Sequence, residues 1–311
     1  MRCRHVHAAK GVARERSHRL AEGSGVMRRR SFLGYGLAAG WAALTPRLAQ
    51  SDGPRPLSIG TTPVFLDDDV AFLRDWQAYL QRELGRTVSF VQRRSYREVS
   101  ELLLAEKLDA AWICGFPYVR YRDRMRLLAV PTWEGEPLYR SYVIVPSSDQ
   151  TTQSIGDLGG KIYAFSDPDS NSGWLVPNSL LFRMGKDAAT FFRKTFFTWG
   201  HRRVVDAVAV GLAQGGSVDG YVWETLKLHH PEITEQTRVA YRSVKYGHPP
   251  FVTRSRLPAS DFKQLQEVLV NMRSNSAGQD LLRRLNLEGF QIAPESVFNG
   301  IAENMRMLHL G

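Results

Sequence analysis

The chain has 311 residues and a formal net charge of +10. The charge is uneven, because residues 1–51 hold 10 of the 41 basic residues and only 2 of the 31 acidic ones. Residues 52–311 therefore carry 31 basic and 29 acidic side chains, a balance of +2 that gives no reason to expect a nucleic-acid partner. This part can form one large domain or two small ones. Its one cysteine, Cys114, excludes an internal disulfide.

Residues 28–49 have the features of an export signal. Arg29 and Arg30 precede an apolar stretch over residues 32–44, which is too short to span a bilayer and has the length of a signal-peptide core. The order Arg-Arg-Ser-Phe-Leu resembles the twin-arginine signal. A buried N-terminal helix is the alternative. We expect export to the periplasm by the twin-arginine route.

The ends of this leader can also be predicted. Small residues at Ala49 and Ser51 indicate cleavage before Asp52. Met27 directly precedes the arginines, so we expect translation to start there and residues 1–26 to be an untranslated extension. No cysteine follows the apolar stretch at a lipoprotein-like position, and no later apolar run reaches membrane length. The mature chain is therefore expected to be soluble and not inserted in a membrane.

Short apolar strands alternate with amphipathic helices in the first part of the mature chain. Ser95 and Glu98 form a capping-box pattern that marks the start of one of these helices. The expected strands are 57–60, 87–92, 109–114 and 127–131, and the helices occupy 67–84 and the residues after 95. This alternation predicts a parallel sheet with right-handed crossovers.

Two long extended runs divide the rest of the chain. The runs are 140–146 and 238–246; strands at 161–166, 195–199 and 218–223 lie between them, and helices near 259–273, 277–285 and 294–308 follow. The pattern predicts an α/β protein with two Rossmann-like lobes joined by two extended hinge crossings. We expect lobe 1 to hold residues 52–142 plus 244–311, and lobe 2 to hold residues 143–243.

Ligands of open α/β sheets bind beyond the carboxyl ends of the strands, which identifies the candidate site. After strand 161–166 come Ser170, Asn171, Ser172 and Gly173, at the start of a helix. Free N–H groups, two hydroxyls and an amide there would form an anion cradle, and Gly173 would let a ligand approach the backbone closely. The alternative is ordinary N-capping by Ser170 or Ser172.

Five further residues lie near strand ends. His201 can donate to an anion oxygen, Cys114 and Tyr118 follow strand 109–114, Tyr96 begins a helix, and Glu224 can accept from a cationic group. Each also has a purely structural explanation. His201 could be an exposed histidine near a helix cap, Cys114 a small buried thiol, and Glu224 a glutamate at the front of a helix. Tyr96 and Tyr118 could be core aromatic residues.

Three segments resemble the phosphate, phosphite and phosphonate periplasmic binding proteins, a branch of the type II substrate-binding fold. They are SYREVSELLLAEKLDAAWICGFPYV, DPDSNSGWLVPNSLL and WGHRRVVDAVAVGLAQGGSVDGYV, and the resemblance covers nearly the whole mature chain. The usual Ser-Thr-Ser-Gly loop of that family is Ser-Asn-Ser-Gly here, at residues 170–173. The family's Ser-His-Asp is Gly200-His201-Arg202, so an arginine replaces the acid.

The resemblance implies roles for the candidate residues. Ser170, Asn171, Ser172 and His201 would contact oxygens of a tetrahedral anion. Tyr96 and Tyr118 would close over the ligand from the other lobe.

The expected function is that of a non-catalytic binding protein without a cofactor or bound metal. It would capture phosphate, phosphite or a phosphonate between the lobes and present it to an ABC transporter permease. Cys114 leaves an alternative open, because a soft thiol suits arsenite. The resemblance extends to periplasmic arsenite-binding proteins with a cysteine in the cleft, and it then implies an arsenite sensor that signals to a membrane histidine kinase. A cysteine hydrolase using Cys114 and His201 is a weaker alternative, since no third orienting residue stands out.

Overall fold

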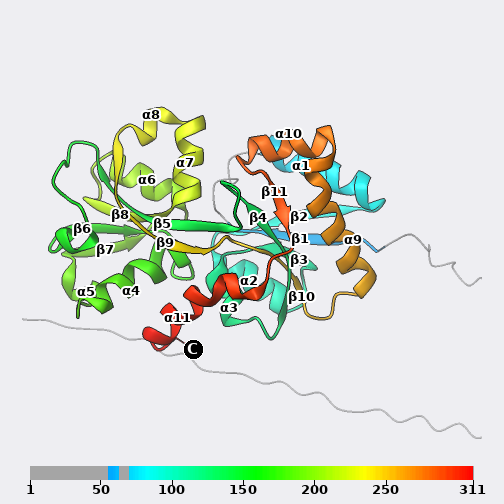
Figure 1. Cartoon of the computed structure of the whole chain (residues 1–311), viewed down its shortest axis with the longest axis horizontal. Coiled ribbons are helices and arrows are strands. Elements are labelled where there is room, and N and C mark those ends of the chain that lie inside the picture. The colour runs from blue at the N-terminus through cyan, green and yellow to red at the C-terminus, as the bar shows by residue number, and fades with distance from the viewer. Residues whose placement is uncertain (1–54, 63–69, 311) are drawn as a thin grey trace, which may run out of the picture. The chain divides into compact units, whose positions relative to one another are not determined.

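The computed structural model describes residues 55–62 and 70–310. The expected leader, its cleavage site and its start codon lie outside these residues. The described chain forms two α/β lobes, each built on its own sheet (Figure 1). We refer to the lobe with the six-stranded sheet as lobe 1 and the lobe with the five-stranded sheet as lobe 2.

The sheet of lobe 1 mixes parallel and antiparallel strands. Its order is β11-β4-β10-β3-β1-β2. The strands are β1 (Leu57–Thr61), β2 (Val88–Gln92), β3 (Ala110–Trp112), β4 (Met125–Thr132), β10 (Phe251–Arg254) and β11 (Gly289–Gln291). β1 pairs in parallel with β2 and β3, as the alternating pattern predicts.

β10 and β11 make this sheet mixed, whereas the alternating pattern predicts a parallel sheet. The chain returns from lobe 2 and inserts β10 between β3 and β4, antiparallel to both. The strand expected at 127–131 forms as part of β4, which is separated from β3 by β10. β10 and β11 are short strands that the hydrophobic pattern did not reveal, and both pair with segments far away in the sequence.

The sheet of lobe 2 has the order β7-β6-β8-β5-β9. Its strands are β5 (Leu138–Pro146), β6 (Ile162–Phe165), β7 (Lys194–Phe197), β8 (Gly215–Asp219) and β9 (Thr237–Gly247). β6 pairs in parallel with β7 and β8, whereas β5 is antiparallel to β8 and β9. β5 and β9 contain the two extended runs of the sequence, and they pair from Leu138–Gly247 to Pro146–Thr237.

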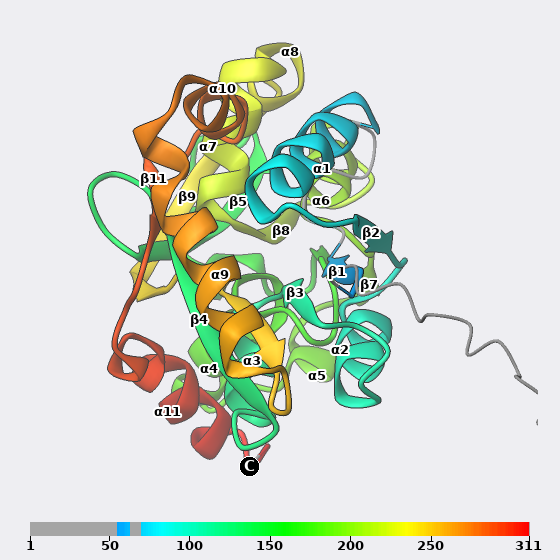
Figure 2. The ribbon, with the colours of Figure 1, turned by 90° about the vertical axis from the view of Figure 1, so that its right-hand side faces the viewer.

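Eleven α-helices are described, six in lobe 1 and five in lobe 2. Those of lobe 1 are α1 (Val70–Leu84), α2 (Tyr96–Leu104), α3 (Gly115–Arg120), α9 (Ala259–Val270), α10 (Ser276–Arg284) and α11 (Asn299–Met307). Those of lobe 2 are α4 (Val176–Arg183), α5 (Ala188–Phe191), α6 (His201–Ala209), α7 (Gly220–His229) and α8 (Pro231–Thr234). Figure 2 shows α1 and α10 on one side of the sheet of lobe 1, and α2 and α3 on the other.

The core of lobe 1 is centred on one tryptophan of α1. Trp76 is fully buried, and its ring lies 5.3 Å from Phe90, 5.8 Å from Trp112 and 5.8 Å from Phe251 between centroids. Aromatic rings bury large apolar areas and favour such tilted contacts. The packing fixes β2, β3 and β10 against one helix, and so fixes the ends of these strands.

Candidate functional site

The loop after β6 carries the predicted anion cradle, and the structure buries it. Ser170, Asn171 and Ser172 are at most 1% exposed, and Gly173 is buried as well. Residues Asn171–Leu175 form a π-helical turn that continues directly into α4. π-helical turns are rare and occur frequently at functional sites.

The two serines of this loop differ in what holds them. Ser170 Oγ accepts the backbone N–H of Gly173 at 3.0 Å, which is the N-capping role that the alternative interpretation predicted. Its hydroxyl proton is still available, because a hydroxyl both donates and accepts. Ser172 Oγ is buried and makes no hydrogen bond of good geometry among the described residues, although it lies close enough to the Tyr139 hydroxyl to lower the pKa of that group. Of the two serines, Ser172 is therefore the one whose hydroxyl is not engaged in capping the helix.

Gly173 has a different role from the one expected. A Cβ atom at this position would lie 1.8 Å from Ser166 Oγ and 2.7 Å from Ser166 Cβ. The space beside Gly173 is therefore filled by the protein itself. The structure explains this glycine by close packing against Ser166, not by room for a ligand.

Asn171 connects the loop to the hinge and to lobe 1. Its backbone N–H points to Cys114 Sγ at 3.2 Å, and its Nδ2 donates to the Tyr139 hydroxyl at 2.9 Å. Asn171 Oδ1 is buried and has no partner among the described residues. Rotating the amide by 180° would let Tyr139 donate to Oδ1 and would free the NH₂ group, so Asn171 can offer either a donor or an acceptor.

His201 is the first residue of α6 and is held in one orientation. Its Nδ1 accepts the backbone N–H of Asp219 at 3.1 Å. The side chain is buried, and burial lowers its pKa to about 3. The ring is therefore neutral at pH 7. Because Nδ1 accepts a hydrogen bond, Nε2 carries the proton and is a donor.

Tyr96 approaches this group from lobe 1. Its ring centroid lies 6.4 Å from that of His201, and its backbone N–H at the start of α2 donates to Asp167 Oδ2 at 3.1 Å. Asp167 also accepts the N–H of Asp169 at 2.8 Å. Burial raises the pKa of Asp167 to about 6. The start of α2 is thus bound to the cradle loop of lobe 2.

Asp219 is a member of the cluster that the sequence analysis did not identify. It ends β8 and caps α7, where its carboxylate accepts the N–H of Tyr221 at 2.9 Å and that of Val222 at 3.4 Å. Burial raises its pKa to about 8, so most of this carboxyl group is protonated at neutral pH. The strand expected at 218–223 would place Asp219 near its start, which is wrong: β8 ends at Asp219, and Gly220–His229 form α7.

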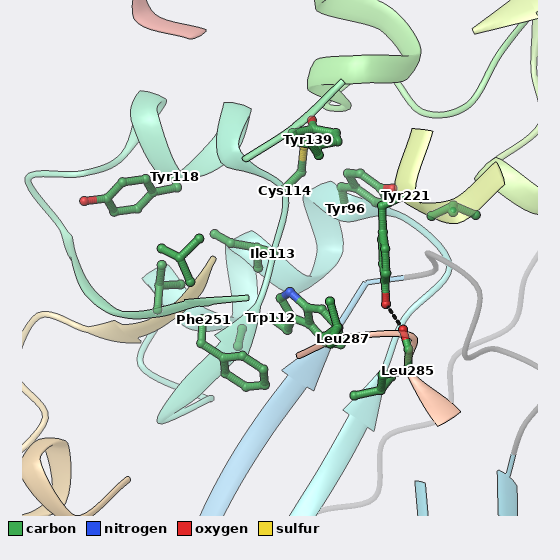
Figure 3. Close-up of a cluster of buried hydrophobic side chains, with 14 of the residues drawn as sticks. Tyr96, Trp112, Ile113, Cys114, Tyr118, Tyr139, Tyr221, Phe251, Leu285 and Leu287 are labelled. Atoms are coloured by element: carbon green, nitrogen blue, oxygen red, sulfur yellow. Dashed lines mark hydrogen bonds between the residues drawn. The ribbon is translucent and has the colours of Figure 1, made fainter. Parts of the chain in front are cut away.

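Cys114 belongs to the cluster, but its thiol is not activated. It is 4% exposed, lies immediately before α3, and Figure 3 shows it next to Tyr139. Burial raises its pKa to about 12, so the thiol stays protonated at neutral pH. A nucleophilic cysteine requires a lowered pKa, and the Nδ1 of His201 is already engaged by a backbone group. This geometry argues against a cysteine hydrolase.

Two predicted residues are not brought together with the others. Figure 3 shows Tyr118 pointing away from Cys114, and its ring lies 5.0 Å from that of Phe298. Glu224 accepts a hydrogen bond from the Tyr142 hydroxyl at 3.2 Å. It lines a hollow of about 290 Å³ together with Tyr139 and Tyr142, and no residue of the cradle loop is part of this lining.

The cluster can bind an oxyanion through neutral donors. These are the Ser170 and Ser172 hydroxyls, the Asn171 amide and the Nε2–H of His201. Within residues 55–62 and 70–310, no three His, Cys, Asp or Glu side chains lie together as a metal site would require. No described helix is long and apolar enough to cross a membrane.

Comparisons with known proteins identify the family to which the chain is similar. A sequence profile described as "ABC transporter, phosphonate, periplasmic substrate-binding protein" matches residues 59–298. The chain is 30% identical to the "Phosphate-import protein PhnD" of Mycolicibacterium smegmatis over 158 residues, which are 47% of this chain and 48% of that protein. It is 24% identical to the "Phosphonates-binding periplasmic protein" of Escherichia coli over 230 residues, which are 71% of this chain and 68% of that one.

A solved structure shows the same fold. PhnD1 from Prochlorococcus marinus, in complex with methylphosphonate, superposes with a TM-score of 0.74 at 20% identity, over 83% of this chain and 100% of that one. The first curated relative is matched over about half of its length only. The profile match, in contrast, extends from β1 to the segment before α11. The chain therefore belongs to the periplasmic substrate-binding proteins of phosphonate ABC transporters.

Proposed function

We propose that the chain captures a small phosphonate-type oxyanion between its lobes and presents it to an ABC transporter in the periplasm. The observation that carries this proposal is the buried Ser172 hydroxyl without a hydrogen bond of good geometry, beside an Asn171 amide that is only half satisfied. Buried polar groups are normally paired, so an open hydrogen-bonding position on each of these side chains favours a partner from outside the chain. An anion oxygen accepts from the Ser172 hydroxyl, and from the Asn171 NH₂ group once the amide is rotated so that Oδ1 accepts from Tyr139.

The mouth of the cleft supports an anionic ligand. Arg93 and Arg94 follow β2 in lobe 1, and Arg203 lies on α6 in lobe 2. Together with Trp199 they line a surface hollow of about 850 Å³. Guanidinium groups around an entrance raise the local concentration of anions and speed their association. All lining residues lie within four positions of the two cluster members Tyr96 and His201 in the sequence.

The arsenite alternative depends on Cys114 alone. Its thiol is buried and protonated, and it accepts the N–H of Asn171. The relatives named above are described as phosphate or phosphonate proteins. We therefore propose the ABC transporter as the partner and not a membrane histidine kinase. The twin-arginine route of export remains part of the proposal, on the strength of Arg29 and Arg30.

The proposal can be tested with alanine variants of two serines, of which only Ser170 caps the helix by accepting the N–H of Gly173. Ser172→Ala should cost about 1–3 kcal/mol of binding, the value for a hydrogen bond to a charged group, and should leave stability unchanged or raised. Ser170→Ala should lower the melting temperature as well, because an N-cap contributes about 0.5–2 kcal/mol.

Calorimetry with methylphosphonate, phosphite, phosphate and sulfate gives the affinities, and thermal unfolding gives the stability. We expect methylphosphonate or phosphite to bind best. Wild-type protein that binds none of these anions would refute the proposed function. Unchanged affinity of Ser172→Ala would refute the assignment of the cradle.

A further inference from the structure

His248 is a buried histidine that the proposed site does not yet use. It lies directly after β9, at the point where the chain returns to lobe 1. Its side chain is 0% exposed, and neither Nδ1 nor Nε2 makes a hydrogen bond of good geometry among the described residues, although the neighbouring Pro249 carbonyl lies close enough to act on the pKa of the ring. An imidazole with both nitrogens buried and unpaired is costly, and buried polar side chains are paired in the large majority of cases.

The backbone around His248 is fixed, so the ring cannot simply turn to solvent. Its own N–H donates to the carbonyl of Pro137 at 2.9 Å. The carbonyl of Pro249 accepts from Trp112 Nε1 at 2.8 Å, and that of Pro250 accepts from the backbone of Ile113 at 3.1 Å. These bonds attach the segment to the end of β3, directly before Cys114.

Two tyrosines hold the ring of His248. The Tyr139 ring lies 5.5 Å away at 53°, and the Tyr221 ring lies 4.9 Å away at 65°. Both hydroxyls are engaged elsewhere: Tyr139 with Asn171 Nδ2, and Tyr221 with the carbonyl of Leu285 (Figure 3). They do not satisfy the imidazole.

The same tyrosines connect His248 to the proposed anion site. Tyr139 bonds to Asn171, whose Oδ1 is also unpaired, and the backbone N–H of Tyr221 bonds to Asp219. Asp219 in turn donates its own N–H to His201. His248 therefore lies beside two residues that contact the cluster directly, at the hinge end of the cleft. A phenylalanine would fill this aromatic slot without an unpaired nitrogen, so packing alone does not explain a histidine.

We propose that His248 is a ligand-contacting residue, whose ring N–H donates to an oxygen of the bound anion from the hinge side. This proposal rests on the proposed function of the cleft. It adds a donor opposite the loop 170–172, so that the anion is held by the cradle loop, by His201 and by the hinge. Burial keeps the imidazole neutral, with one N–H donor and one acceptor nitrogen.

The test compares His248→Phe and His248→Gln in the full mature chain. Methylphosphonate is the calorimetric probe. His248→Phe should raise its Kd at least tenfold, while the melting temperature without ligand stays equal or rises, because an unpaired polar ring has been removed. His248→Gln keeps a side-chain N–H and should recover part of the affinity. His229→Gln, at the exposed end of α7, is the matched control and should leave Kd unchanged.

A purely structural histidine would give the opposite result. In that case His248→Phe would change the melting temperature without changing Kd, and this outcome overturns the proposal. If His248→Phe does not fold, His248→Gln with wild-type Kd overturns it equally. The side-chain ¹⁵N resonances of His248 provide a second readout, since methylphosphonate should shift them. Failure of the proposed function is distinguishable, because the wild type itself would then bind no phosphonate.

Discussion

Asp169 is placed to hold the cleft closed without contacting the ligand. Its carboxylate, in the loop after β6 of lobe 2, accepts from Arg97 Nε at 3.2 Å and from Arg120 Nη1 at 3.0 Å. Both arginines belong to lobe 1. Opening the cleft must separate these groups, so the two ion pairs stabilise the closed form only. Asp169→Asn should therefore shift the protein toward the open form.

The size of this effect follows from the exposure of the three side chains. Asp169 is 7% exposed, Arg120 26% and Arg97 63%. Exposed pairs contribute about 0–1 kcal/mol, so the Arg97 contact is worth little after solvent screening. Hydrogen bonds between charged groups with less exposure contribute about 1.5–3 kcal/mol, which applies to Arg120 at the lower end. We expect a loss of about 1.5 kcal/mol, or roughly a tenfold shift toward the open form.

Calorimetry and small-angle X-ray scattering test this prediction. Asp169→Asn should raise the Kd for methylphosphonate about tenfold, because binding must then also drive closure. The radius of gyration of the ligand-free variant should be equal to or larger than that of the wild type, and that of the saturated variant should be unchanged. Asp123→Asn, at an exposed carboxylate of lobe 1, is the control. A wild-type Kd in Asp169→Asn would refute the reasoning.

Four further predictions address the site and export. His201→Ala should cost about 1–3 kcal/mol of methylphosphonate binding with a native-like circular dichroism spectrum, and unchanged affinity would contradict the donor role. Asp219 has a raised pKa, so the folded state binds its proton more tightly than the unfolded state. The free energy of unfolding should therefore fall as pH rises from about 4 to 8. Asp219→Asn should flatten this decline in thermal melts. Cys114→Ser should leave methylphosphonate affinity within about 1 kcal/mol, since a hydroxyl also accepts the N–H of the cradle loop. Arsenite binding by the wild type that is lost in this variant would contradict the phosphonate assignment. Replacing Arg29 and Arg30 by Lys should leave precursor in the cytoplasm, and normal processing on a fractionation blot would contradict the twin-arginine route.

Local signals in the sequence were sufficient for much of the fold. Ser95 and Glu98 form the predicted capping box, with the Ser95 side chain accepting from the Glu98 backbone. The extended runs became β5 and β9 because both are rich in β-branched and aromatic residues and contain no internal Gly or Pro. β10 was missed, since a four-residue strand is defined by its two neighbours in the sheet and not by its own pattern.

The site was harder to predict, because the end of a strand fixes where a residue lies in the chain but not the direction in which its side chain points. Tyr118 lies one turn after Cys114 on α3, with its N–H donating to the Cys114 carbonyl at 3.3 Å. The turn of the short helix moves its ring toward Phe298 and away from the cleft. Asp219 and His248 had no motif of their own. Their roles depend on burial, which the sequence pattern does not report for single polar residues.

The placement of charge explains how the proposed site can be stable both without and with its ligand. A buried guanidinium without a partner costs several kcal/mol, and a cleft that releases its ligand is empty for part of each cycle. Neutral donors such as Ser172 and His201 carry a much smaller cost when unoccupied. The arginines Arg93 and Arg203 line the surface hollow instead, where their exposed guanidinium groups are hydrated. The arginines at the entrance thus attract the anion. The neutral donors inside bind it and still allow its release.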